Sequence, residues 1–390
     1  MQVAIVHDWL YVIGGAERVL REVLRCYPKA DVFTLFDVLT PEDRAWIGFE
    51  SSRASFMQRI PRIGKIHRWL LPMMPLAVEQ LDLSGYDLVI SSSCAVAKGV
   101  ITGPDQVHVA YVHSPMRYAW DLQHEYLRGR ASVSNALARI MLHRVRLWEA
   151  STGLRPDLVI ANSAFIARRI KKVLGRQATV VHPPVDVSAV APPPLRQDYF
   201  LAAGRLVSYK NVGAVVEAFK LLPELRLVVA GTGPELKHLQ AKAGRNISFT
   251  GFVTDLEMRR LMATARALVF AAEEDFGIIP VEAQAEGTPV LALGCGGIRE
   301  TVVVSGPSRT GMFFEELTPA AIAACINAFL VQETTFSRKA CRDNVQVFSE
   351  GRFRREFTAA VEKELARARL EITSSRAGSR AGAQLGVAVG

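Results

Sequence analysis

The chain has 390 residues, 49% of them hydrophobic and 22% charged, so it is long enough for two domains with separate cores and too apolar for general disorder. Its formal charge of +9 leaves three anionic partners open: nucleic acid, an anionic membrane or a phosphorylated ligand. The apolar run at 70–78 is broken by prolines, which argues against a membrane-spanning helix, and the five widely spaced cysteines argue against a disulfide framework and favour a reducing cytoplasm.

Short, continuous apolar runs recur along the chain and predict buried parallel strands, because strands covered on both faces do not alternate apolar and polar residues. The runs in the first half are 3–6, 31–35, 88–92, 108–113, 158–161 and 179–182. Those in the second half are 200–203, 225–230, 247–251, 267–271, 290–293 and 311–314. Amphipathic stretches between them, such as 16–24 and 212–222, predict helices. This β-α-β repetition predicts an α/β protein with two doubly wound, Rossmann-like sheets.

Proline clusters separate the two halves. One covers residues 182–186 and the other residues 191–194, and neither can continue a central strand or a helix interior. We therefore expect a first domain over 1–190 and a second over 191–351. A helix over 352–372 is expected to return to the first domain. The Ser-, Gly- and Ala-rich residues 373–390 lack periodicity and predict a disordered tail.

Two loops of the first half follow predicted strands. Gly14 and Gly15 open a helix, where backbone amides can approach a phosphate, although a simple turn explains the pair equally well. His113 begins the run His-Ser-Pro-Met-Arg-Tyr-Ala-Trp-Asp, and such a polar, aromatic loop suits contact with a substrate. A structural role is the alternative for this histidine. No histidine or cysteine spacing indicates a metal site.

Two loops of the second half carry the strongest signals. Glu274 and Glu282 flank a glycine-containing turn that opens a short helix at the carboxyl end of a strand, where open α/β sheets bind ligands. Arg205 and Lys210 follow the strand at 200–203 and precede a helix, which suits a clamp for a diphosphate. The alternatives are a solvated acidic turn and a basic surface loop.

A basic segment with interleaved apolar residues lies in the first half. Residues 51–78 contain no acid but carry Arg53, Arg59, Arg62, Lys65 and Arg68 beside Trp69 and other apolar side chains. A second basic stretch spans 139–146. This pattern is typical of contact with a membrane surface or a lipid-linked acceptor. A solvated basic helix with a packed apolar face is the alternative.

Together these motifs resemble those of retaining, nucleotide-sugar-dependent glycosyltransferases of family 4, which have the GT-B fold of two Rossmann-like domains facing across a cleft. Residues 274–282 match the E-x7-E motif of that family. Further motifs occur in family order over nearly the whole chain, at 14–18, 113–121, 161–163, 182–186, 204–210, 231–234, 251–252 and 296–300. The variant at 113–121 is similar to that of bacterial mannosyltransferases of surface-polysaccharide and O-antigen assembly, including lipopolysaccharide.

The resemblance implies a role for each matching residue. It implies that Arg205 and Lys210 hold the diphosphate, Glu282 the ribose and Glu274 the transferred sugar, with His113 lining the sugar pocket and these groups, Glu282 apart, forming the catalytic set. The implied donor-binding residues are Gly14, Gly15, Gly204, Arg205, Lys210, Gly231, Phe252, Val253, Glu274, Phe276, Gly277, Ile278 and Glu282. The implied acceptor and membrane contacts are Arg117, Tyr118, Arg59, Arg62, Lys65, Arg68 and Trp69. No D-x-D sequence occurs, so we expect no metal and no cofactor.

The expected function is transfer of a hexose, mannose from GDP-mannose, to a lipid-linked oligosaccharide at the inner face of the cell membrane, where the enzyme is a peripheral cytoplasmic protein. A UDP-sugar donor is the alternative, because no residue identifies the base. An NAD-dependent oxidoreductase is disfavoured, because the first strand leads to Gly14-Gly15 and not to G-x-G-x-x-G. No nucleic-acid-binding module is present, so nucleic acid is not an expected partner.

Overall fold

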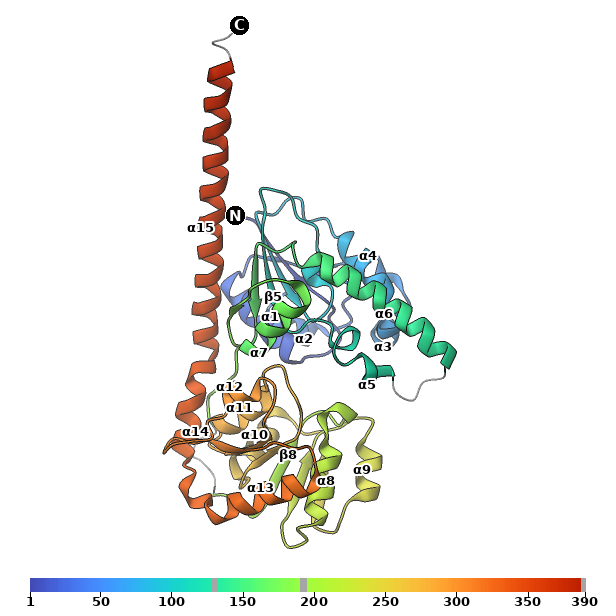
Figure 1. Cartoon of the computed structure of the whole chain (residues 1–390), viewed down its shortest axis with the longest axis vertical. Helices are drawn as coiled ribbons and strands as arrows, with labels where there is room; N and C mark the ends of the chain where they lie inside the picture. Colours follow the sequence, from blue (N-terminus) through green and yellow to red (C-terminus); the bar gives the residue numbers. More distant parts are fainter. Residues whose placement is uncertain (128–131, 190–194, 387–390) are drawn as a thin grey trace. The chain divides into compact units, whose positions relative to one another are not determined.

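The computed structural model describes residues 1–127, 132–189 and 195–386 (Figure 1). The chain divides into two compact units, each with its own parallel sheet. Unit 1 comprises Met1–Val181 and Phe353–Gly390, and unit 2 comprises His182–Arg352. The predicted α/β class with two doubly wound sheets is confirmed.

Unit 1 is built on a parallel sheet with the strand order β3-β2-β1-β4-β5-β6-β7. The central β1 pairs with β2 on one side and β4 on the other, so that Ile5 lies between Val32 and Ile90. The carboxyl ends of β1, β4 and β5 therefore meet at one edge of the sheet. The strands are β1 (Val3–His7), β2 (Asp31–Thr34), β3 (Ser52–Ala54), β4 (Leu88–Ser93), β5 (Val107–Val112), β6 (Leu158–Ala161) and β7 (Thr179–Val180).

Helices cover both faces of this sheet, because successive strand residues point to opposite sides. Ile5 packs with α1 and α15, whereas Ala4 and Val6 pack toward α3, α4 and α6 on the other face (Figure 1). The helices are α1 (Gly15–Cys26), α2 (Pro41–Ile47), α3 (Ile63–Ile66), α4 (Met74–Glu79), α5 (Gln123–Leu127), α6 (Ser132–Thr152), α7 (Ala164–Leu174) and α15 (Glu350–Gly386). Short 3₁₀ turns are η1 (Phe56–Arg59), η2 (His67–Met73), η3 (Ala97–Gly99) and η4 (Arg117–Ala119).

Unit 2 is built on a second parallel sheet, with the order β10-β9-β8-β11-β12-β13. Its strands are β8 (Phe200–Ala203), β9 (Leu227–Ala230), β10 (Ile247–Gly251), β11 (Leu268–Phe270), β12 (Val290–Leu293) and β13 (Gly311–Phe314). Its helices are α8 (Val212–Lys220), α9 (Leu236–Lys242), α10 (Asp255–Thr264), α11 (Ile278–Ala285), α12 (Ile298–Thr301), α13 (Pro319–Val331) and α14 (Arg338–Val345). Short 3₁₀ turns are η5 (Ser208–Lys210), η6 (Glu333–Thr335) and η7 (Gln346–Phe348).

The structure differs from the sequence prediction at three places. The division between the units falls at 181/182, not 190/191, because Val185 pairs with Ser349 and donates its amide to Phe348 (2.9 Å) inside unit 2. The second proline cluster, 191–194, lies outside the described residues. The edge strand β3 was not predicted, because Ser-Arg-Ala has no strand signature.

The predicted disordered tail is also different in the structure. Helix α15 continues through this segment to Gly386, where the sequence predicts a helix end at 372; residues 387–390 lie outside the described part. Extending an existing helix needs no new nucleation, and the Ala and Arg residues of this segment are good helix formers. Among the described residues, none of the helices combines the length and apolar composition needed to cross a bilayer.

Candidate functional site

The loop after β8 carries Arg205 and is held by the loop after β9. The amide of Gly204 donates to Ala230 (3.0 Å) and that of Leu206 donates to Thr232 (2.8 Å), so the two loops stay paired beyond their strands. A Cβ on Gly231 would lie 1.9 Å from the carbonyl oxygen of Gly204, so only glycine permits this approach. The pairing fixes the backbone of Arg205, whose side chain is exposed at the carboxyl edge of the sheet.

The turn η5 brings Lys210 to the acidic loop after β11. The ammonium of Lys210 forms an ion pair with the carboxylate of Glu274, and both side chains are about four-fifths buried. Asn211, which follows η5, donates its side-chain amide to the carbonyl of Ala271 (3.1 Å). The two loops with the strongest sequence signals are therefore tied together directly.

The acidic loop is supported by the glycine pair that precedes α12. The amide of Gly297 donates to the carbonyl of Glu274 (2.8 Å), and a Cβ on Gly297 would lie 2.3 Å from the carbonyl oxygen of Asp275. Past Gly277 the chain enters α11, whose first amides have no partner within the helix. The structure thus places a carboxylate, an ammonium and a helix N-terminus beside one another, an arrangement suited to a phosphorylated, hydroxyl-rich ligand.

Of the other predicted residues of unit 2, three lie around this centre and two do not. Phe276 and Ile278 flank Gly277, and Glu282 lies one turn after Ile278 on the same face of α11. Phe252 is 80% exposed after β10, and Val253 packs beside the core. Two strands separate β10 from β11, so the structure does not bring this pair next to Glu274.

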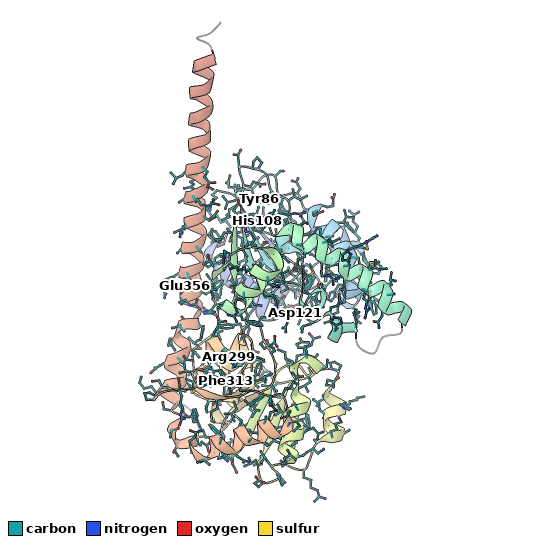
Figure 2. The ribbon with its side chains drawn as sticks, in the orientation of Figure 1. Tyr86, His108, Asp121, Arg299, Phe313 and Glu356 are labelled. Atoms are coloured by element: carbon teal, nitrogen blue, oxygen red, sulfur yellow. The ribbon has the colours of Figure 1, made fainter. Side chains whose placement is uncertain are left out.

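His182 of unit 2 lies beside the acidic loop and close to Glu300, and no role was predicted for either residue. The His182 ring stacks on Phe276 with centroids 5.4 Å apart, and its Nε2 atom lies 3.9 Å from a carboxylate oxygen of Glu300. The neighbouring Arg299 lies over the Phe313 ring, 5.7 Å from its centroid (Figure 2). The proline motif at 182–186 and the glycine motif at 296–300 were each visible in the sequence, but their convergence was not.

In unit 1 the predicted glycine loop and His113 both lie at the carboxyl edge of the sheet, after β1 and β5. Gly14 precedes α1 and donates its amide to Glu17 Oε2 (2.8 Å), so this amide is already engaged inside the protein. Gly15 is the first residue of α1. His113 Nε2 lies 2.9 Å from Ser92 Oγ, and burial, followed by the nearby His7, lowers the pKa of His113 from 6.5 to about 3. His113 is therefore neutral at neutral pH.

The loop after His113 is anchored by Glu149 of α6. The Glu149 carboxylate accepts from the Met116 amide (3.1 Å) and the Trp120 indole (2.7 Å), and it pairs with the buried Lys98 (2.8 Å). Arg117 and Tyr118, between these two anchors, remain partly exposed. The predicted acceptor contacts are thus carried on a loop held by buried polar groups.

The predicted membrane contacts form a basic, apolar surface along η1, α3 and η2. Trp69 is 77% exposed, and the exposed cations of this surface are Arg59, Arg62, Lys65 and Arg68. Phe56, Met73 and Leu76 are exposed in the same segment. Helix α6 contacts η2 and exposes Leu137, Ile140 and Leu147 beside the cations Arg139 and Arg144.

Two protein families match the chain in succession. Residues 13–189 match Glycosyltransferase Family 4, and residues 187–347 match Glycosyl transferases group 1. The boundary between the matches lies close to the division between the units.

Curated relatives and a solved structure extend the comparison. The Alpha-1,3/1,6-mannosyltransferase alg2 of Schizosaccharomyces pombe is 26% identical over 56% of this chain and 51% of the relative. A glycogen synthase of Mycobacterium tuberculosis is 29% identical, over 62% of each chain. The chain thus spans about half to two-thirds of the length of these relatives. Anabaena Alr3699/HepE, solved with UDP and glucose, has a TM-score of 0.68 at 19% identity, over 93% of this chain and 99% of that one.

Proposed function

We infer that this protein is a glycosyltransferase that takes a sugar from a nucleoside diphosphate donor and retains the anomeric configuration of that sugar. The chain has the GT-B fold of the glycosyltransferases, and a region that matches Family 4 is followed by one that matches group 1. The single observation that carries this inference is the Lys210–Glu274 ion pair beside the N-terminus of α11. A diphosphate competes for the ammonium, and the carboxylate is then available to sugar hydroxyls.

The proposed chemistry needs fixed positive charge where the diphosphate leaves. As the bond between the anomeric carbon and the diphosphate oxygen breaks, negative charge accumulates on the leaving group, and preorganised cations stabilise it. In our proposal Arg205 and Lys210 supply this charge, Glu282 accepts from the ribose hydroxyls and His113 lines the sugar pocket. The acceptor hydroxyl attacks on the face that the diphosphate leaves, and its proton passes to the departing diphosphate oxygen. No metal or cofactor is part of this proposal.

We propose mannose from GDP-mannose as the donor. The relative named as a mannosyltransferase and the motif at 113–121 support this choice. A UDP-sugar is the second candidate, because the fold relative HepE was solved with UDP and glucose.

We propose that the acceptor is a lipid-linked oligosaccharide of bacterial surface-polysaccharide assembly, and that the protein docks peripherally on the anionic inner leaflet. The support is the basic, apolar surface, where Trp69 and four cations are exposed and no acidic residue occurs between 51 and 78. Exposed cations attract anionic headgroups, and exposed apolar side chains enter the interface between headgroups and acyl chains.

A donor panel tests the reaction. The protein is incubated with GDP- and UDP-sugars and lipid extracts, with and without EDTA, and nucleotide release and product mass are measured. We expect release of GDP from GDP-mannose, unaffected by EDTA. Turnover only with UDP-sugars would replace the donor. An absence of turnover with every donor, together with no thermal shift by GDP or UDP, would overturn the enzyme proposal.

Two variants test the assigned roles. Lys210→Ala and Glu282→Ala should each weaken use of the donor by about 1.5–3 kcal/mol, the contribution of a hydrogen bond to a charged group. Lys220→Ala is the matched control, because Lys220 is a lysine of the same unit that pairs with the exposed Glu217. Wild-type kinetics in both test variants would refute the roles.

Liposome sedimentation tests the membrane proposal. Wild-type protein should sediment more with anionic than with neutral vesicles, and Lys65→Glu should reduce that difference. Lys237→Glu, at an exposed lysine of α9, makes the same charge change in unit 2 and should have little effect. Equal sedimentation with both vesicle types at moderate salt contradicts the proposal.

A further inference from the structure

Four polar side chains of unit 1 form a continuous hydrogen-bonded chain that ends at His113. Glu17 Oε1 lies 3.3 Å from His7 Nε2, His7 Nδ1 lies 3.1 Å from Ser92 Oγ, and Ser92 Oγ lies 2.9 Å from His113 Nε2. Glu17, His7 and Ser92 are 6%, 2% and 1% exposed. The direction of each hydrogen bond in this network is therefore set by the protein groups themselves and not by bulk water.

The direction of donation is set at Glu17. An ionised carboxylate only accepts hydrogen bonds, and its two oxygens take the Gly14 amide (2.8 Å) and the His7 Nε2–H group. In a neutral His7 ring the other nitrogen, Nδ1, is then an acceptor. The single hydroxyl proton of Ser92 must therefore point to His7.

The direction of donation at His7 also determines the tautomer of His113. Since the hydroxyl proton of Ser92 is directed to His7, its oxygen accepts from His113, which places the proton of the neutral His113 ring on Nε2. His113 Nδ1 then carries a lone pair, and among the described residues it has no hydrogen-bond partner. The backbone of His113 is held separately, because Asn162 donates to its carbonyl (2.9 Å).

We propose that Glu17, through His7 and Ser92, is a positioning residue that holds His113 in the Nε2–H tautomer, so that Nδ1 accepts a hydrogen bond from a hydroxyl of the sugar substrate. The second part rests on the proposed function. The same carboxylate holds the Gly14 amide, so one side chain orders both the glycine loop and the histidine.

A conservative variant should reverse the chain without changing its size. In Glu17→Gln the glutamine side chain has a single oxygen, which accepts from the backbone N–H of Gly14. Its side-chain NH₂ group then faces His7 Nε2. His7 becomes the Nδ1–H tautomer and donates to Ser92, Ser92 donates to His113 Nε2, and the His113 proton moves to Nδ1. Ser92→Ala interrupts the chain, and Ser92→Thr keeps a hydroxyl.

The test is ¹⁵N NMR of the full chain labelled at histidine, without substrate, at pH 8, above the ordinary histidine pKa of about 6.5. The His113 signals are assigned by their absence in His113→Asn. We expect Nδ1 of His113 to be unprotonated in the wild type and Ser92→Thr, and protonated in Glu17→Gln. A protonated Nδ1 in the wild type, or an unchanged tautomer in a folded Glu17→Gln, overturns the proposal.

Kinetics supply the second readout. Glu17→Gln and Ser92→Ala should each lower kcat/KM about tenfold, the effect of one lost hydrogen bond. Ser92→Thr keeps the hydroxyl and should have a kcat/KM close to that of the wild type. Because the NMR needs no turnover, an inactive protein with the expected tautomer contradicts the proposed function alone. An active protein with a protonated Nδ1 contradicts this inference alone. If Glu17→Gln has a reversed His113 tautomer but wild-type kinetics, His113 Nδ1 does not accept a hydrogen bond from the sugar.

Discussion

At the scale of single residues, unit 1 holds charges and histidines in its interior. Lys98 and Glu149 are 1% and 0% exposed and lie 2.8 Å apart, and Asp8 accepts four backbone amides from residues 94–97. Groups of this kind are stable inside a protein only when they are fully partnered. They make the loops at the carboxyl edge rigid, and they make the unit sensitive to the loss of one partner.

Removal of Lys98 should be costly. Lys98→Met leaves the buried Glu149 without its cation and should lower the free energy of unfolding by about 3–5 kcal/mol. Urea unfolding followed by tryptophan fluorescence measures this in unit 1 alone, because all five tryptophans lie there: Trp9, Trp46, Trp69, Trp120 and Trp148. The double variant Lys98→Met/Glu149→Gln should lose less than the single one. A loss below about 1 kcal/mol in Lys98→Met contradicts the prediction.

Acid should destabilise unit 1 through His108, which is buried within the unit (Figure 2). Burial, followed by the charge of Arg155, lowers the pKa of His108 from 6.5 to about 3. The unfolded chain therefore binds the proton more readily below pH 6.5, and stability present above that pH is lost as the pH falls toward 3. Between pH 7.5 and 5 the loss is about 2 kcal/mol for this histidine.

The same fluorescence assay at pH 7.5 and 5 checks the effect. His108→Gln should reduce the loss of stability on acidification, whereas His143→Gln, at an exposed position on α6, should leave it unchanged. Equal losses in the wild type and His108→Gln would show that the ring is not the source.

At the scale of elements, the proposed site of unit 2 depends on loops that touch through their backbones. The loops after β8 and β9 meet at Gly204 and Gly231, and the loop after β11 rests on Gly297. Each contact aligns one loop with its neighbour, and through Lys210 and Glu274 the three loops become one assembly. A side chain inserted at a contact therefore moves the whole assembly.

Gly231→Ala tests this dependence. Its φ of +134° costs an alanine about 1–3 kcal/mol, and the added Cβ meets the Gly204 oxygen, which displaces Arg205. We expect a lower melting temperature by circular dichroism and weaker binding of GDP. Gly213→Ala, within α8, is the control, because its Cβ would make only an ordinary contact with Leu239 of α9, at 3.6 Å, and alanine should stabilise α8. Equal melting temperatures for Gly231→Ala and the wild type would refute the packing argument.

At the scale of the whole molecule, the end of the chain completes the core formed by its beginning. Phe353, Phe357 and Val361 of α15 are fully buried with Ile5 and Leu20. Arg354 pairs with Glu22 across 332 positions of sequence. Unit 1 therefore cannot close its core until the chain has passed through unit 2 and returned.

Phe357→Ala should consequently destabilise unit 1, because Phe357 packs against core residues such as Ile5 and Leu20 that lie more than 300 positions earlier in the sequence. Loss of a fully buried phenylalanine costs about 3–5 kcal/mol, which tryptophan fluorescence reports as an earlier urea transition. Leu370→Ala, on the same helix but 72% exposed, should change stability by less than about 0.5 kcal/mol. If the two variants unfold at the same urea concentration, α15 is not part of the core.

Much of this protein could be read from local patterns. Runs of apolar residues located every described strand except β3, twelve in all, to within about two residues, because burial on both faces requires such runs. The loops with Arg205, Lys210 and Glu274 were recognised from their place after strands. Strand β3 was not predicted, because Ser52–Ala54 is short and polar. The last part of α15 was not predicted either, because the Gly and Ser residues among its helix formers are typical of a disordered tail.

Local sequence patterns were enough to establish the α/β architecture and the edge of each sheet that carries polar side chains, since both follow from the period and order of residues along the chain. Three contacts became visible only in the folded chain: the Lys210–Glu274 ion pair, the stacking of His182 on Phe276, and the path from Glu17 to His113 through His7 and Ser92. Their partners are brought together by strand order and burial, and these long-range contacts leave no signature in local periodicity. The return of the C-terminal helix to unit 1 was expected from the sequence, and the structure adds which residues it packs against, among them Ile5 and Leu20.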